Sequence, residues 1–131
     1  MSMSPLPSLT PLARRLCLLL AAAVSAQLFY LGAQPLAVGL FHEPWDKLAH
    51  GIVYGGIAAL LWLGFGGRHP IWVIGIPTLI GAADEWHQRY LPGRSADFND
   101  FLADAIAAIA VCLLLRTLGA RPQRDETCAG S

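Results

Sequence analysis

The chain has 131 residues, of which 55% are hydrophobic and 14% charged, and its mean hydropathy is +0.50. A soluble domain carries roughly 25% charged residues, so this composition excludes an ordinary soluble protein and indicates an integral membrane protein. The formal net charge of +0 excludes the basic surface that nucleic-acid binding requires.

The length allows one domain, residues 1–131, for which we predict an all-α, integral membrane four-helix bundle with short loops. Residues 1–12 contain three prolines and are predicted to be a flexible leader. The run from Leu16 to Phe41 is uncharged, whereas a helix needs only about 20 residues to cross the hydrocarbon core. The first span is therefore predicted at residues 13–34. A cleaved signal peptide ending at Ala26 is the alternative, but the apolar sequence continues beyond that point.

Three further spans are predicted at residues 46–66, 70–90 and 97–118, followed by a flexible tail at 119–131. The uncharged runs of the last two spans, 71–83 and 105–115, reach only roughly 17–20 Å at 1.5 Å per residue. Runs this short also occur in buried helices of soluble proteins. In a membrane, the acidic ends of these spans must lie at membrane depth, where charged groups face the bundle interior.

The basic residues predict the orientation. With four spans, six arginines fall on the side of the two termini: Arg14, Arg15, Arg68, Arg116, Arg121 and Arg124. The opposite side has three basic residues: Lys47, Arg89 and Arg94. The positive-inside rule predicts a multi-pass membrane protein with both termini in the cytoplasm and the acidic residues at the outer face.

The second span begins with a polar stripe. Asp46, His50 and Tyr54 are spaced by four and four, so they share one helical face. His50 is a candidate for proton exchange, because histidine titrates near neutral pH, and a hydrogen bond to Asp46 or Tyr54 is the alternative. Asp46 could equally cap the helix, and Lys47 could extend to the lipid headgroups.

The third span ends with Asp84, Glu85 and Gln88, of which Asp84 and Gln88 share a face. Neighbouring carboxylates suit acid–base chemistry, and a polar helix end is the alternative. His87 lies three residues from Asp84, but this pair does not make a metal site, so we predict no metal.

The fourth span begins with an acidic stripe. Asp97 is the predicted N-cap, and Asp100 is the predicted third residue of a capping box. Asp104 lies two turns into the helix, where a carboxylate needs a partner, and Lys47 or Arg94 is the nearest candidate. Arg94 could instead bind a ligand carboxylate or phosphate with its planar guanidinium.

These polar clusters resemble one family in both order and spacing. Residues 46–54, 84–88, 92–94 and 97–104 carry the patterns DKxxHxxxY, DExxQ, PGR and DxxDxxxD. They resemble the VanZ-like family of small bacterial membrane proteins, named for a teicoplanin-resistance accessory protein. The resemblance implies four helices in the cytoplasmic membrane and a role in the cell envelope, sometimes linked to tolerance of glycopeptides. The family often has Asn at the position of Asp104 and Gly at that of Ala107.

From these residues we predict a polar pocket at the outer face that binds or modulates a lipid-linked cell-wall precursor, a lipid headgroup or the antibiotic. The pocket residues are predicted to be Asp46, Lys47, His50, Tyr54, Asp84, Glu85, Gln88, Arg94, Asp97, Asp100 and Asp104. The sequence assigns no reaction and no cofactor. An intramembrane hydrolase or transferase using His50, Asp84 or Asp104 is the second hypothesis. A proton-coupled carrier and a purely structural scaffold are further alternatives.

Overall fold

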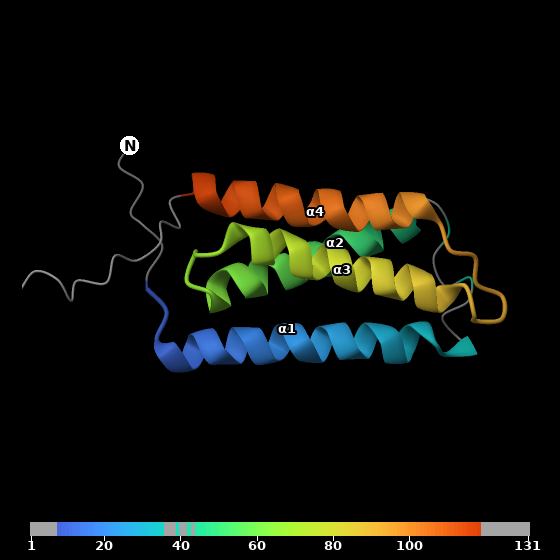
Figure 1. Cartoon of the computed structure of the whole chain (residues 1–131), viewed down its shortest axis with the longest axis horizontal. Helices are drawn as coiled ribbons and strands as arrows, with labels where there is room; N and C mark the ends of the chain where they lie inside the picture. The colour runs from blue at the N-terminus through green and yellow to red at the C-terminus, as the bar shows by residue number, and fades with distance from the viewer. Residues whose placement is uncertain (1–7, 36–38, 40–41, 43, 119–131) are drawn as a thin grey trace, which may run out of the picture.

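The computed structural model of the chain describes residues 8–35, 39, 42 and 44–118. Over these residues it contains four helices and no strand: α1 (Pro11–Gly32), α2 (Trp45–Gly64), α3 (Pro70–Gln88) and α4 (Phe98–Thr117). Successive helices run in opposite directions and lie side by side (Figure 1). The prediction of an all-α four-helix bundle is confirmed. The predicted tail and most of the predicted leader lie outside the described residues.

Local sequence signals determine where the helices begin and where the chain turns. At the start of α1, Ala13 N donates a hydrogen bond of 3.2 Å to Thr10 Oγ1, and Pro11 occupies a first-turn position that needs no N–H. Between α2 and α3, Gly66 and Gly67 have φ angles of 65° and 72°, which glycine adopts without steric cost. This tight turn places α3 antiparallel to α2.

The apolar core is centred on α2. Among the described residues, the buried hydrophobic side chains are Ala21, Tyr54, Ile57, Ala58, Leu61, Trp62, Val73, Ala108 and Cys112. Five of these nine belong to α2. Close packing against α4 depends on Gly55, because a Cβ atom at this position would lie 3.2 Å from Val111 Cγ2.

Helix α1 is the peripheral member of the bundle. It packs chiefly against α2 and only marginally against α3. Its one buried residue is Ala21. The two helices pack closely at Gly64 of α2, where a Cβ atom would lie 2.5 Å from Leu18 Cδ2. Most of the α1 surface is therefore left to the surroundings of the protein.

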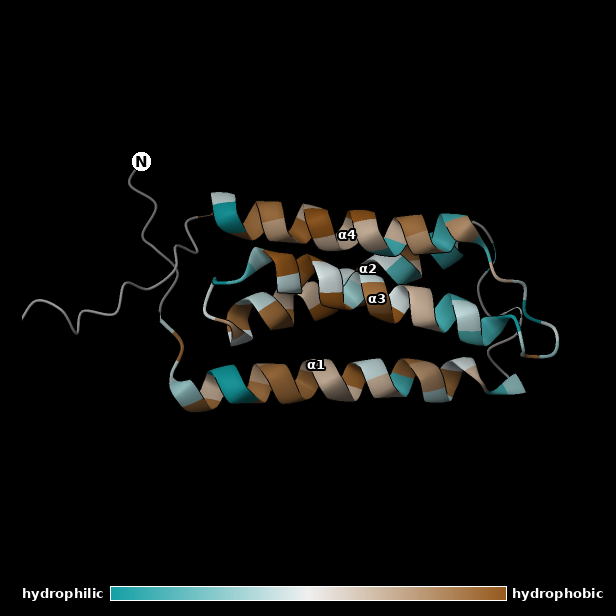
Figure 2. Ribbon diagram, in the orientation of Figure 1, coloured by the Kyte–Doolittle hydropathy of each residue, from teal (hydrophilic) through white to brown (hydrophobic). Residues whose placement is uncertain are grey.

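The distribution of polarity differs from that in a soluble protein. The interior contains buried polar or charged residues, namely Asp84, Glu85, Gln88, Asp100 and Asp104. Large apolar side chains such as Leu19, Ile71 and Leu79 are exposed, and the middle of each helix is predominantly hydrophobic (Figure 2). Helices α1, α2 and α4 are long and apolar enough to cross a membrane. The chain is a membrane protein, with polar side chains directed inward as a bilayer requires.

Helix α3 packs against α4 at Gly81, where a Cβ atom would lie 2.6 Å from Asp104 Oδ2. Because the added methyl group overpacks this contact, Gly81→Ala is expected to lower the free energy of unfolding by about 1–3 kcal/mol. Equilibrium unfolding in mixed detergent micelles measures this change. The control is Gly75→Ala on the same helix, because an added Cβ atom at Gly75 would meet no atom within 4 Å and helix propensity favours alanine. Equal unfolding midpoints for the two variants would contradict the close contact of α3 with α4.

Candidate functional site

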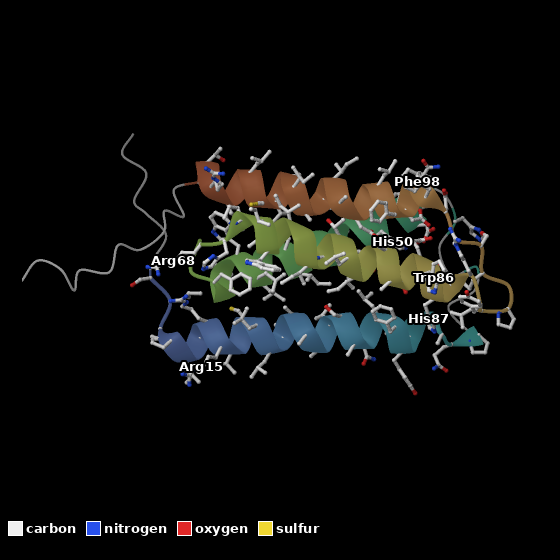
Figure 3. All side chains as sticks on the ribbon, in the orientation of Figure 1. Arg15, His50, Arg68, Trp86, His87 and Phe98 are labelled. Atoms are coloured by element: carbon white, nitrogen blue, oxygen red, sulfur yellow. The ribbon has the colours of Figure 1, made fainter. Side chains whose placement is uncertain are left out.

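Polar side chains gather at one end of the bundle, where α2 begins, α3 ends and α4 begins. This end is teal in Figure 2, and it is opposite to the end where α1 begins and α4 finishes. Figure 3 places His50, Trp86 and Phe98 toward this end and Arg15 and Arg68 at the other. Residues from three segments of the sequence thus meet at the same end.

His50 joins α2 to α4. Its Nδ1 atom lies 3.0 Å from Asp104 Oδ1, within hydrogen-bond distance, and its Nε2 atom lies 3.9 Å from Asp46 Oδ1. The ring of Tyr54 stacks on that of His50, with centroids 5.8 Å apart and planes 14° from parallel. Neither Asp46 nor Tyr54 is therefore the hydrogen-bond partner of His50. The histidine is held by a residue 54 positions away in the sequence.

Asp104 is completely buried, with 0% of its surface exposed. We expected Lys47 or Arg94 to compensate it, and the structure instead brings His50 to its Oδ1 atom. The reason is the depth of each residue, because His50 lies almost one turn deeper on α2 than Lys47. The Oδ2 atom lies against Gly81, whose missing side chain leaves the necessary space.

Lys47 lies between the acidic residues that open α4. Its Nζ atom is 3.6 Å from Asp97 Oδ2 and 3.6 Å from Asp100 Oδ1. The alternative in which Asp46 caps α2 is wrong, because the N-cap position is occupied by Pro44 and Asp46 lies in the first turn. A carboxylate in the first turn is still favourable there, because it faces the positive end of the helix dipole.

The start of α4 is capped by its own N-cap residue and by a side chain of α3. Asp97 is the N-cap, as predicted, and its Oδ1 atom accepts a hydrogen bond of 2.9 Å from Asn99 N. The expected capping box with Asp100 does not form. Glu85 of α3 takes that role, because its Oε2 atom accepts a hydrogen bond of 2.9 Å from Asp97 N. Asp100 thereby faces Lys47 and ties α4 to α2.

A pocket of about 280 Å³ lies between α1, α2 and α3. Its polar wall contains Asp46, His50, Tyr54, Asp84, Gln88 and Arg94. Its apolar wall contains Leu28, Leu31, Ala49 and Val53. Six of the eleven predicted site residues therefore share one cavity, and they come from two helices and the loop before α4.

Hydrogen bonds order part of the polar wall. Gln88 Nε2 donates to Asp84 Oδ2 at 2.9 Å, and Arg94 Nη2 donates to the carbonyl oxygen of Gly32 at 3.3 Å. Tyr54 is only 1% exposed, and its hydroxyl has no hydrogen-bond partner among the described residues. The pocket therefore combines a guanidinium, carboxylates, an amide and a buried hydroxyl. These groups can bind a ligand that carries both hydrogen-bond donors and an anionic group.

The other five predicted residues lie outside this pocket. Lys47, Glu85, Asp97, Asp100 and Asp104 form the contacts that hold α2, α3 and α4 together. His50 belongs to both groups. Sequence reasoning missed the wall supplied by Leu28, Leu31 and Gly32 of α1, which no polar pattern marks. It also missed Gly81, whose spacing of three from Asp84 is a weak signal.

One trio of side chains has the spacing of a metal site. Ligand atoms of Asp46, His50 and Asp100 lie within 4.8 Å of one another. Lys47 already places a positive charge 3.6 Å from Asp100 Oδ1. Lys47 therefore compensates part of the negative charge of this trio, and we assign no metal to it.

The sequence that forms this site matches one protein family. The model of the VanZ/LLP1 family matches residues 4–119, a range that contains all four helices and every predicted site residue. The chain belongs to the VanZ/LLP1 family. No curated protein and no solved structure matches it. The VanZ-like resemblance read from the polar clusters is confirmed, and the match also includes α1.

Antibiotic resistance is the biological context of the VanZ/LLP1 family as a whole. This context assigns neither a ligand nor a reaction to the pocket. The site combines one cavity with an adjacent network of contacts that joins three helices.

The contact of His50 with Asp104 is expected to stabilise this VanZ/LLP1 protein. His50→Leu leaves a fully buried polar group unpaired, which should lower the free energy of unfolding by about 1–3 kcal/mol. The double variant His50→Leu/Asp104→Leu should recover most of this loss, because replacing both partners of a buried pair by apolar side chains is often neutral. Unfolding of both single variants and the double variant in mixed micelles gives the coupling energy. A coupling energy of zero would contradict the contact.

Proposed function

We propose that this VanZ/LLP1 protein binds the polar head of a lipid-linked cell-envelope precursor, or of a related envelope lipid, in the pocket between α1, α2 and α3. The observation that carries the proposal is the mixed lining of the 280 Å³ cavity. Leu28 and Leu31 are among its apolar lining residues, and Asp84 and Arg94 are among its polar ones. An amphiphilic ligand likewise has an apolar and a polar part.

The polar wall suits the head of such a ligand. Arg94 has a planar guanidinium that can form paired hydrogen bonds with a phosphate or carboxylate. Asp84 and Gln88 accept and donate hydrogen bonds to hydroxyl and amide groups, such as those of sugars and short peptides. The buried hydroxyl of Tyr54 gains a partner when a ligand is bound.

The ligand's hydrocarbon part can remain in the bilayer. Helix α1 forms one side of the pocket and packs only marginally against α3, so the apolar wall lies next to the lipid-facing surface. We infer that the polar head enters between α1 and α3, which avoids transfer of the lipid chain through water.

We further infer that the chain is a multi-pass protein of the bacterial inner membrane, with the pocket at the extracytoplasmic face. Arg14, Arg15, Arg68 and Arg116 lie on the helices and the turn at the opposite end of the bundle. The positive-inside rule assigns that end to the cytoplasm. A pocket at the outer face is accessible to precursors and to glycopeptides outside the cell.

Cysteine labelling tests this orientation. In a variant without native cysteines, Ser95→Cys in the loop before α4 is expected to react with a membrane-impermeant maleimide in intact cells. Thr117→Cys, at the end of α4, should react only after the membrane is permeabilised. Both positions are exposed in the structure, so a difference in labelling between them reports on which side of the membrane each one lies. The reverse labelling pattern would place the pocket in the cytoplasm.

Arg94→Ala is expected to weaken binding of a lipid-linked precursor by about tenfold or more, because one charge-assisted hydrogen bond is lost. Native mass spectrometry of the detergent-solubilised protein measures the binding. The same variant should remove any gain in teicoplanin tolerance that the unaltered protein gives to a susceptible bacterium, at matched membrane levels. The loss follows because tolerance, in this proposal, requires the occupied pocket.

Arg89→Ala is the matched control, because it removes an arginine that is exposed and does not line this pocket. It should bind the precursor as the unaltered protein does. Equal binding by Arg94→Ala and the unaltered protein would contradict the pocket as the ligand site. If teicoplanin susceptibility equals that of the empty vector in every case, the role in glycopeptide tolerance is wrong.

A second candidate function is an intramembrane hydrolase or transferase acting on the same lipid. The 3.0 Å contact between Asp104 Oδ1 and His50 Nδ1 favours it, because this contact orients the ring while His50 also lines the pocket. Incubation of the precursor with the unaltered protein and with His50→Gln distinguishes the two. An enzyme converts the precursor only when His50 is present, whereas a binding protein returns it unchanged.

A further inference from the structure

A second pocket, of about 240 Å³, lies on another face of α3, where α3 ends and α4 begins. It shares no lining residue with the first pocket. Its walls contain Glu85, Trp86, Arg89, Phe98 and Phe101, and Figure 3 shows Trp86 and Phe98 near the polar end of the bundle. Adjacent residues of α3 therefore serve different cavities, Asp84 the first and Glu85 the second.

One carboxylate oxygen of Glu85 has no hydrogen-bond partner among the described residues. Glu85 is 9% exposed, and its Oε2 atom accepts the hydrogen bond from Asp97 N. Its Oε1 atom is buried and has no hydrogen-bond partner among the described residues. Because buried polar atoms in proteins are nearly always hydrogen-bonded, a donor supplied by a ligand would complete this carboxylate.

The rest of the pocket lining consists of three aromatic side chains, two alanines and one arginine. The rings of Phe98 and Phe101 lie 5.6 Å apart, and the guanidinium carbon of Arg89 lies 5.6 Å from the ring centroid of Trp86. Arg89 thus already covers one face of Trp86, which makes the ring a poor selector of quaternary ammonium groups. The exposed guanidinium can bind an anion beside the pocket.

We propose that this second pocket binds a phospholipid headgroup in which a primary ammonium follows a phosphate, as in phosphatidylethanolamine. The ammonium donates a hydrogen bond to Glu85 Oε1, and the phosphate contacts Arg89. The lipid's hydrocarbon lies along the phenylalanine side of the pocket. The opposite charges of Glu85 and Arg89 match those of the zwitterionic headgroup, and tryptophan is typical of the depth at which headgroups lie.

Native mass spectrometry of the full chain in detergent tests the proposal with three probes that have the same acyl chains: phosphatidylethanolamine, phosphatidylcholine and phosphatidylglycerol. Phosphatidylethanolamine is expected to bind about tenfold more tightly than each of the others, the value of one hydrogen bond to a charged group. Phosphatidylcholine differs from it only in the methyl groups that remove the ammonium hydrogens. Equal binding of these two lipids would overturn the proposal.

Glu85→Gln should abolish the tenfold preference, because it removes the charge and keeps an oxygen that can accept from Asp97 N. Trp86→Leu removes the ring against which Arg89 lies, so it should weaken binding of phosphatidylethanolamine itself without touching the cap of α4, and it carries the test if Glu85→Gln does not fold. Trp72→Leu is the matched control, because Trp72 is 58% exposed on the same helix and Trp86 is 61% exposed. Weakened binding by Trp72→Leu, or unchanged binding by Trp86→Leu, would overturn the proposal.

The result is independent of the function proposed for the first pocket. Arg94→Ala is expected to keep the preference for phosphatidylethanolamine, since Arg94 does not line the second pocket. Loss of this preference in Arg94→Ala would assign the lipid to the first pocket instead and overturn the proposal.

Discussion

The hydrogen bond between His50 and Asp104 joins α2 to α4 at a depth where Asp104 is fully buried and His50 is partly buried. Asp104 is too far into α4 to act as a cap, so its burial requires a donor from another helix. His50 is the hydrogen-bond partner that α2 brings to Asp104, and Gly81 of α3 leaves the space for the other carboxylate oxygen. Three helices are thus placed relative to one another by one buried carboxylate. The ion pairs of Lys47, nearer the helix ends, follow from the same alignment of α2 and α4.

The adjacent acids of α3 have different surroundings because successive residues of a helix point about 100° apart. Asp84 faces α1 and α2, where Gln88 bonds it and the first pocket lies. Glu85 faces α4, where it accepts the backbone N–H of Asp97. A pair that looks like one acidic cluster in the sequence is in fact two separate groups. The end of α3 is therefore the partition between the two pockets.

Sequence patterns predicted the class of fold and the family, because hydrophobic runs and helical spacing are local properties. The spacing of Asp46, His50 and Tyr54 predicted a shared face, and all three line one pocket. Partners between helices could not be predicted in this way, because they depend on the rotation and depth of each helix. Asp104 was therefore given the wrong partner. The capping role expected of Asp100 fell to Glu85, since nothing in the local sequence reveals an acceptor arriving from another helix.

Helix α1 contributes Leu28 and Leu31 to the wall of the first pocket but buries only Ala21 in the core. Substitutions along most of α1 consequently alter little of the packing on which folding depends. The shape of one pocket wall can therefore diverge between related chains while the polar wall and the helix network stay constant. In such a bundle, the range of accepted ligands can evolve through its least anchored helix without loss of the folded state.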